Sequence, residues 1–160
     1  MAWIRGVVLA GAGWAALGLA LGVVGCTGGQ RQSEQREQSG LKTLAILYMQ
    51  FSSQHRGVGP ANEAEFKKFI QGLPEAQRAA LGVKDVEKLF VSDRDGKPYV
   101  IRYGVNARAA PGPKGPSDAP VLGYEQLGSG GRRFVANSLG AVEELDEAAF
   151  KQRVPDAKTP

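Results

Sequence analysis

An uninterrupted apolar stretch near the amino terminus limits which part of this 160-residue chain can form a globular domain. It runs from Gly6 to Gly25, follows a single basic residue, Arg5, and ends at Cys26, the only cysteine of the chain. One positive charge, an apolar run and small residues before a cleavage site are the layout of a secretory signal peptide. We therefore expect residues 1–25 to be removed and the folded domain to lie in the remainder.

The last residues of this stretch and the cysteine, Val23, Val24, Gly25 and Cys26, resemble the lipobox of bacterial lipoproteins. In that family the chain is cut before the cysteine, whose sulfur and amine are then acylated. The resemblance implies lipidation at Cys26 and a membrane-anchored protein of the bacterial cell envelope, facing the periplasm or the exterior. Thr27 follows the cysteine, and a residue other than aspartate there favours the outer membrane in Gram-negative members of the family.

A retained membrane-spanning helix is the alternative interpretation of the same stretch. Twenty residues without a charge are long enough to cross a bilayer at about 1.5 Å per residue. However, six glycines and five alanines dilute the apolar run over 6–25, and a sole cysteine at the lipobox position would then be a coincidence. Both interpretations attach the rest of the chain to a membrane.

The composition after the signal excludes several classes of protein. Only Arg5 is lost from the 20 basic residues, so 19 remain against 16 acidic ones, a net charge of +3. These charges are spread along the chain and predict no nucleic-acid surface. His55 is the only histidine, and no free thiol remains once Cys26 is acylated. Neither a Ser–His–Asp nor a Cys–His set can form, and we expect a non-enzymatic protein without a cofactor or a metal.

The remainder divides into a spacer, one domain and a short tail. Residues 26–40 hold the lipidated cysteine and then lack any apolar side chain large enough to pack, which predicts a hydrophilic spacer. Residues 41–154 are enough for one domain and too few for two. Residues 155–160 form the tail.

The first half of the domain has a helical pattern. Apolar residues at three- and four-residue steps predict an amphipathic helix over 41–56. Asn62 lies three residues before Glu65 and predicts the start of a second helix over 62–71. Shorter helices are expected at 75–81 and 85–89. The residues of the first apolar face are Leu41, Leu44, Leu47, Tyr48 and Phe51.

After Phe90 the apolar period changes from helical to two, which is typical of strands. Strands are expected over 99–105, 121–126, 132–137 and 141–145, and Asp146 predicts the cap of a terminal helix. Proline and glycine exclude both a helix and a central strand from the loop 106–120. The order predicts an α+β domain whose first helix packs on an antiparallel sheet of about four strands.

One short motif resembles a known family. Asp93, Gly96, Pro98 and Tyr99 match positions of the D-P-W-G-x-P-Y segment of major pseudopilins from type II secretion systems. The apolar helix upstream, the strand after the motif and the Gly/Ser turn between later strands agree with that family. The resemblance implies a pilin-like head. Family pseudopilins also bind calcium through acidic residues in a late loop, but the comparable stretch 128–133 has no carboxylate, so no calcium site is carried over.

We therefore expect a lipid-anchored envelope protein whose pilin-like head has a non-catalytic, structural or protein-interaction role, with a protein partner in the envelope. The sheet surface or the loop 106–120 would supply recognition. A small-molecule or metal carrier with a pocket between the first helix and the aromatic strand face is the alternative. An enzyme that uses carboxylates alone is the third hypothesis.

Several charged residues allow both a functional and a structural interpretation. Asp93 and Asp95 could begin a calcium loop, but the Lys97-Pro98 that follows favours a simple turn. Arg132 and Arg133 could contact anionic lipid head groups or serve as charges at a strand edge. His55 is expected as a solvated residue at a helix end. The acidic run of Glu143, Glu144, Asp146 and Glu147 could perform acid–base chemistry, but its position favours a helix N-terminus.

Overall fold

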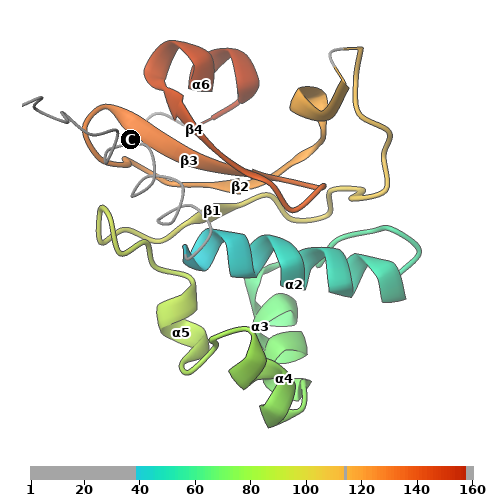
Figure 1. Cartoon of the computed structure of the whole chain (residues 1–160). Coiled ribbons are helices and arrows are strands. Elements are labelled where there is room, and N and C mark those ends of the chain that lie inside the picture. The colour runs from blue at the N-terminus through green and yellow to red at the C-terminus, as the bar shows by residue number, and fades with distance from the viewer. Residues whose placement is uncertain (1–38, 114, 158–160) are drawn as a thin grey trace, which may run out of the picture.

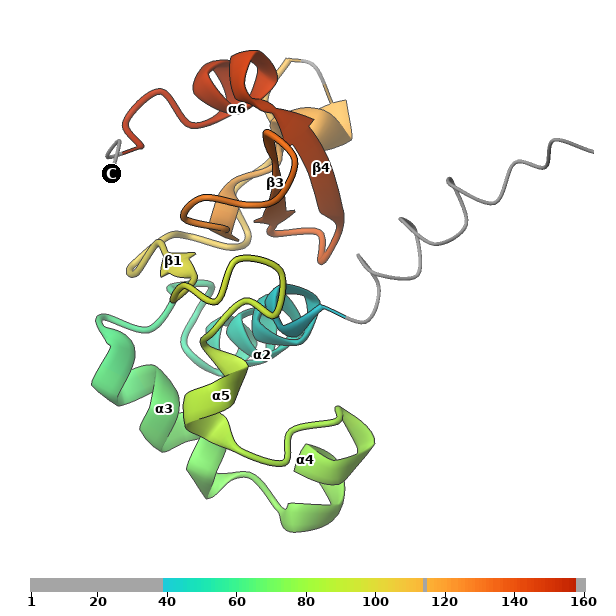
Figure 2. The ribbon, with the colours of Figure 1, turned by 90° about the vertical axis from the view of Figure 1, so that its left-hand side faces the viewer.

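The computed structural model describes residues 39–113 and 115–157, which form a four-stranded antiparallel sheet with helices on both faces (Figure 1). Helix α2 (Gly40–Gln54) covers one face and helix α6 (Glu147–Arg153) the other. Helices α3 (Glu63–Gly72), α4 (Glu75–Ala80) and α5 (Val86–Leu89) lie on the side of α2 that is turned away from the sheet (Figure 2). The predicted α+β class with a four-stranded antiparallel sheet is confirmed.

Helix α2 lies at the centre of the molecule, between the sheet and the helices α3 and α5, and contacts both. Ser39 caps its first turn by accepting a hydrogen bond from the Lys42 amide. The helix ends at Gln54, two residues before the predicted end, because Arg56 and Gly57 both have positive φ values, of 56° and 93°. Such a left-handed conformation cannot continue a right-handed helix. Its buried residues include Leu41, Leu44, Leu47, Tyr48 and Phe51.

Of the three helices that come next in the chain, two begin with a side-chain cap, and the cap of α3 is the one that the sequence predicts. Asn62 accepts a hydrogen bond from the Glu65 amide at 2.9 Å, and the Glu65 carboxylate accepts one from the Ala61 amide. Asp85 caps α5 in the same manner. The α3 side chain Phe66 is fully buried and meets the rings of Tyr48 and Phe90 edge-on, at centroid distances of 5.7 Å each.

The strands β1 (Val100–Ile101), β2 (Val121–Tyr124), β3 (Arg132–Asn137) and β4 (Val142–Asp146) pair in chain order. Residues of β2 and β3 are buried on both faces, which explains why β2 and residues 134–136 of β3 are continuously apolar or small. One face, with Leu122, Phe134 and Ala136, packs on α2. The other face, with Val121, Tyr124 and Val135, packs on Phe150 and Val154 at the α6 end.

The strand predicted over 99–105 is wrong in length, since only Val100 and Ile101 pair with β2. Past Arg102 the chain turns, with Gly104 at a φ of 71°. The Tyr48 hydroxyl donates to the Arg102 carbonyl at 2.8 Å and accepts from the Val105 amide at 3.0 Å. A helix side chain thus takes the place of a neighbouring strand as the partner of this segment.

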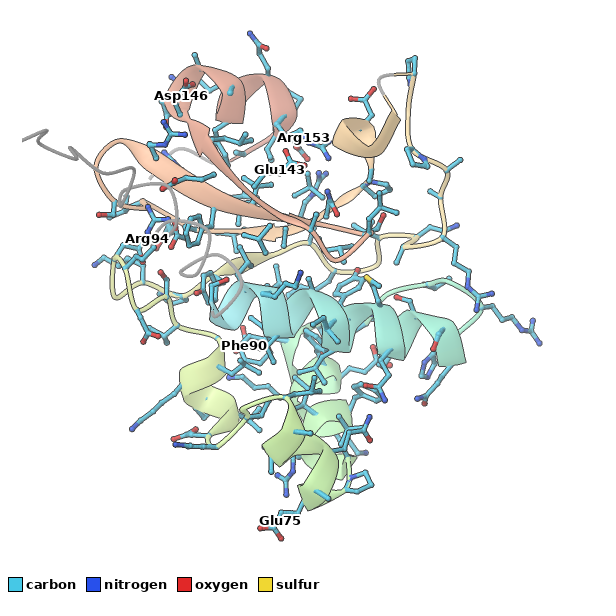
Figure 3. All side chains as sticks on the ribbon, viewed as in Figure 1. Glu75, Phe90, Arg94, Glu143, Asp146 and Arg153 are labelled. Atoms are coloured by element: carbon cyan, nitrogen blue, oxygen red, sulfur yellow. The ribbon has the colours of Figure 1, made fainter. Side chains whose placement is uncertain are left out.

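The prediction that the loop 106–120 holds no helix is also wrong. A 3-10 turn, η1, occupies Gly115–Asp118. A proline is tolerated at the start of such a turn because the first amides of a helix have no partner within it. Arg153 of α6 donates to the Ala119 carbonyl and ties this end of the loop to the terminal helix (Figure 3).

Candidate functional site

The four motif residues Asp93, Gly96, Pro98 and Tyr99 lie in one closed turn between α5 and β1. The Ser92 amide donates to the Lys97 carbonyl at 2.9 Å, and the Gly96 amide donates to the Ser92 carbonyl at 2.9 Å. Gly96 has a φ of 66°, which favours glycine at this position. Pro98 bridges to Val91. The turn places the Tyr99 side chain in the core and leaves Asp93 exposed.

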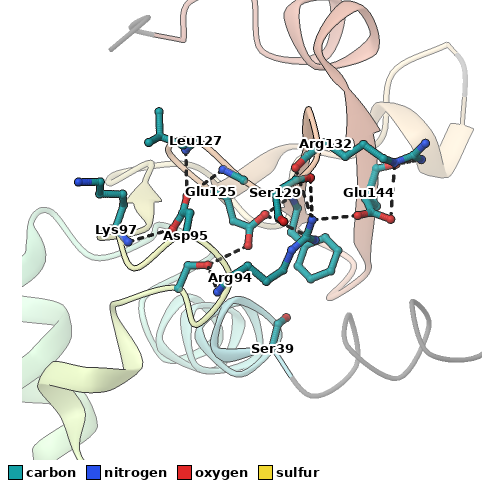
Figure 4. A network of polar contacts seen from close by, with 12 residues as sticks. Ser39, Arg94, Asp95, Lys97, Glu125, Leu127, Ser129, Arg132 and Glu144 are labelled. Carbon is teal, nitrogen blue, oxygen red and sulfur yellow. Dashed lines mark hydrogen bonds and ion pairs between the residues drawn. The ribbon is translucent and has the colours of Figure 1, made fainter.

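Asp95, which lies in the middle of this turn, fastens it to the loop between β2 and β3. Its carboxylate accepts hydrogen bonds from the Lys97 amide at 2.9 Å, the Leu127 amide at 3.0 Å and the Gly128 amide at 2.8 Å (Figure 4). Partial burial alone would raise the pKa of Asp95, but the Lys97, Gly128 and Leu127 amides outweigh it and hold the pKa below its ordinary value. The carboxylate is therefore engaged as an anion.

Arg94 crosses from the same turn into the sheet. Its guanidinium lies over the Phe134 ring at 3.8 Å and donates from Nη2 to Glu144 Oε1 at 3.0 Å. Nη2 also lies 3.4 Å from the Ser129 carbonyl oxygen. Nη1 lies 3.7 Å from Glu125 Oε2. One cation on a turn is thus surrounded by carboxylates and carbonyls of the β2–β3–β4 segment.

Glu125 is the most deeply buried charged group of this arrangement, with no exposed surface. It accepts a hydrogen bond from the Ser92 hydroxyl and one from the Phe134 amide, both at 2.8 Å. Burial raises the pKa of Glu125, while the Phe134 amide, Ser92 and Arg94 act in the opposite direction. We call the set of Ser92, Arg94, Asp95, Glu125 and Glu144 the Arg94 network.

The Arg94 network was not predicted from the sequence. Asp95 was predicted to belong to a turn, and that prediction is confirmed, but the central residues Arg94 and Glu125 were not singled out. The available signal was Glu125 itself, a carboxylate directly after the apolar strand residues 121–124. A charged residue that follows a strand buried on both faces needs a buried partner.

The acidic run at the end of the sheet is also bound up in structural contacts. Glu144 meets Arg94 and Arg132, and Glu147 meets Arg133 at 3.0 Å. Asp146 caps α6 through the Ala149 amide, so the predicted helix N-terminus is confirmed. The Arg133 side chain is buried over the Phe150 ring, whereas Arg132 is exposed at the start of β3. Because β3 pairs with β2 on one side and with β4 on the other, the position expected for this pair at a strand edge is wrong.

His55 lies at the other end of α2 and takes no part in this arrangement. It is exposed, stacks on the Phe51 ring at 3.9 Å, and has Nδ1 2.8 Å from the Phe51 carbonyl oxygen. Within residues 39–113 and 115–157, no group of three or more His, Cys, Asp or Glu side chains is arranged to hold a metal.

Several hollows lie on the surface of the described residues. One, of about 430 Å³, is lined by residues of α2 and α3 that include Phe51, His55 and Phe69. Another, of about 280 Å³, lies beside α6 and is lined by Arg133, Phe150 and neighbouring residues. The pocket expected between the first helix and the aromatic strand face is absent from the described chain, because Leu44, Tyr48, Tyr99 and other core side chains fill that space.

The lipobox-like residues Val23, Val24, Gly25 and Cys26 lie outside the described residues, as does the predicted spacer up to residue 38. In the part of the chain that the structure describes, no helix is both long enough and apolar enough to span a bilayer. No protein-family model, no curated protein and no solved structure matches the chain.

Proposed function

We propose that the protein is a lipid-anchored protein of the bacterial cell envelope, whose pilin-like head has a non-catalytic role in contacts with other proteins. The observation that carries this proposal is the Val23-Val24-Gly25-Cys26 sequence at the end of an apolar run that begins just after Arg5. Stable membrane attachment generally requires more than one acyl chain. A cysteine acylated on both its sulfur and its amine meets that requirement.

The arrangement of the head supports its comparison with pilins. An apolar helix, α2, is packed along one face of an antiparallel meander, and the turn of Asp93, Gly96 and Pro98 directly precedes β1. The chain departs from pseudopilins upstream, where a hydrophilic stretch, 27–40, separates the helix from the apolar run. We therefore propose that the head resembles pseudopilins in its fold but does not assemble into a filament.

The electrostatics of the head support a structural role for its charged groups. Glu125 and Asp95 accept hydrogen bonds from backbone amides, and Arg94 is held between carboxylates and an aromatic ring. Acid–base catalysis needs a group that can exchange protons with a substrate in a cleft. The Arg94 network instead joins two segments of the fold.

Replacement of Cys26 by alanine tests the anchor. We expect the Cys26→Ala protein to leave the membrane fraction or to keep its first 25 residues, since the acceptor of the acyl chains is lost. Thr27→Ala is the matched control, because it changes the neighbouring residue and keeps the cysteine. Membrane fractionation and mass spectrometry of the amino terminus give the result. Normal processing and fractionation of Cys26→Ala would remove the proposal.

The proposed role of the head is tested by chemical crosslinking in cells followed by purification of the protein. A single stoichiometric partner, crosslinked through the loop 106–120, is the expected result, because helices α2 and α6 cover the two faces of the sheet. Turnover of a substrate by the purified protein would contradict the non-catalytic role.

A small-molecule carrier is the second candidate, and the hollow of about 430 Å³ between α2 and α3 favours it. Its lining combines the aromatic rings of Phe51 and Phe69 with the exposed His55 and Lys68. Such a lining suits a small aromatic acid. A ligand that binds the folded state stabilises it, so a rise in melting temperature with small aromatic acids, lost in Phe69→Ala, would support this candidate.

A further inference from the structure

We propose that one end of the head rests on the bilayer and contacts anionic lipid head groups, an inference that rests on the proposed lipid anchor. This amino-terminal face consists of the exposed residues of the turn 91–98 and of the loop 127–132. Figure 2 looks onto it, along the axis of α2.

The face is assembled around the point at which the chain enters α2. Gly40 is packed so closely against the Leu89 carbonyl and the Tyr99 ring that an added Cβ atom would lie 3.0 and 3.4 Å from them. The turn 91–98, which precedes Tyr99, is fastened to the β2–β3 loop because the Asp95 carboxylate accepts hydrogen bonds from the Leu127 and Gly128 amides. The start of α2, the turn and the loop are therefore held together as one rigid end of the molecule.

The exposed side chains of this face suit a lipid surface. Leu127 and Val91 are 44% and 39% exposed, and they are two of only four large hydrophobic residues in the described chain that are this exposed. Figure 4 shows the Leu127 side chain directed away from Asp95 and the rest of the Arg94 network. Apolar side chains beside cations are the composition of interfacial lipid-binding surfaces.

Exposed basic side chains outnumber exposed acidic ones on this face. Lys97 and Arg132 are exposed. Only the backbone of Lys97 is engaged in the turn, whereas the Arg132 guanidinium also lies 3.6 Å from the Glu144 carboxylate. Asp93 is the exposed acid of the same segments, whereas Asp95 and Glu144 lie behind the surface and are held by amides and arginines.

The short chain between the proposed anchor and α2 favours lipid over protein as the partner of this face. Thirteen peptide links join Cys26 to Ser39, so an anchored cysteine holds the start of α2 within about 45 Å of the membrane. The face lies beside Gly40, the point at which the tether enters the head. Because tethering raises the effective concentration of the face at the bilayer, individually weak contacts are enough to hold it there.

Tryptophan fluorescence offers a direct test. The chain has two tryptophans, Trp3 and Trp14, and both belong to the stretch that processing would remove. An introduced tryptophan is therefore the only one in the mature protein. Leu127→Trp places it on the amino-terminal face. Leu139→Trp is the control, because Leu139 is 53% exposed in the β3–β4 turn, at the opposite end of β3.

Each lipidated variant is reconstituted into vesicles of brominated phosphatidylcholine and phosphatidylglycerol in equal amounts. We expect bromine to quench the tryptophan at position 127 and to leave that at position 139 bright. Lys97→Glu in the Leu127→Trp background should lower the occupancy of the contact by about fivefold or more, since one cation near an anionic surface contributes about 1 kcal/mol. Lys68→Glu, a charge reversal at an exposed lysine of α3, should leave the quenching unchanged.

Equal quenching at both positions, or none at position 127, would overturn the inference. Quenching that persists when phosphatidylcholine is the only lipid would overturn its electrostatic part. If position 127 is unquenched in vesicles and crosslinking in cells joins the loop 127–132 to another protein, the face binds protein and the inference is wrong. Vesicle flotation and the mass of Cys26 report the anchor separately. A floating protein that is unquenched at 127 refutes this inference alone, whereas an unmodified Cys26 refutes the proposed function and the inference with it.

Discussion

Substitution of Arg94 by methionine removes the cation that faces both buried carboxylates of the Arg94 network, Glu125 and Glu144. The Arg94 side chain is 17% exposed, and the side chains of Glu125 and Glu144 are 0% and 8% exposed. Methionine keeps much of the aliphatic volume over the Phe134 ring, so the variant tests charge more than packing. Glu144 keeps Arg132 as a partner, but Glu125 is left with only Ser92 and the Phe134 amide.

The expected cost follows from the interactions that the substitution removes. A charge-assisted hydrogen bond such as Arg94–Glu144 contributes about 1.5–3 kcal/mol, and the stacking on Phe134 adds about 1 kcal/mol. Removal of one partner from a buried ion pair costs about 3–5 kcal/mol in total. We expect the free energy of unfolding to fall by about 3 kcal/mol, which corresponds to a drop of about 10 °C in melting temperature for a domain of this size.

Urea unfolding followed by circular dichroism measures this loss, and Arg102→Met is the matched control. Arg102 pairs with Asp156 at 2.8 Å on the surface, with the two side chains 35% and 63% exposed, so its loss should cost less than about 1 kcal/mol. A double-mutant cycle completes the test. If Arg94 compensates the charge of Glu125, Glu125→Gln should cost less in the Arg94→Met background than in the wild type. Strict additivity, or equal losses for Arg94→Met and Arg102→Met, would refute this reasoning.

Two further predictions concern single hydrogen-bonding groups. Tyr48→Phe should lower the free energy of unfolding by about 1–3 kcal/mol, because the buried Arg102 carbonyl and Val105 amide lose their partner; an unchanged urea midpoint would contradict the role of the hydroxyl. Asp95 has a lowered pKa in the folded state, so its contribution to stability is complete above its unfolded pKa of about 4 and is lost as the pH falls through the folded value. Asp95→Asn should therefore be less stable at pH 7 and lose less stability on acidification, which unfolding curves at several pH values between about 7 and 2 would measure.

The sequence predicted the elements whose apolar pattern or cap is local. The 3.6-residue period of Leu41, Leu44 and Leu47 was enough for α2, and Asn62 and Asp146 marked the starts of α3 and α6 within a residue. These features depend on neighbours three or four positions away, which a sequence shows directly.

The interactions made across the fold were not predictable in this way. The strand expected over 99–105 stops after Ile101 because the Tyr48 hydroxyl, more than fifty residues earlier, binds the backbone of Arg102 and Val105. The Arg94 network joins the turn at 92–95 to residues 125 and 144. Nothing in the sequence around Arg94 distinguishes it from a solvated arginine until its partners are placed beside it.

The chain-order pairing of the four strands has a consequence for how the head acquires its structure. Each pairing in the sheet joins strands that are consecutive in the chain, so the meander can form by successive local steps. Contacts between nearby segments form faster than contacts between distant ones. Helix α2 comes first in the chain, yet the part of its apolar surface that faces the sheet is covered only when β2 and β3 have formed. Because synthesis proceeds from the amino terminus, this apolar surface of α2 stays uncovered until roughly eighty further residues have been made, and incompletely folded chains that expose such surfaces are prone to aggregate.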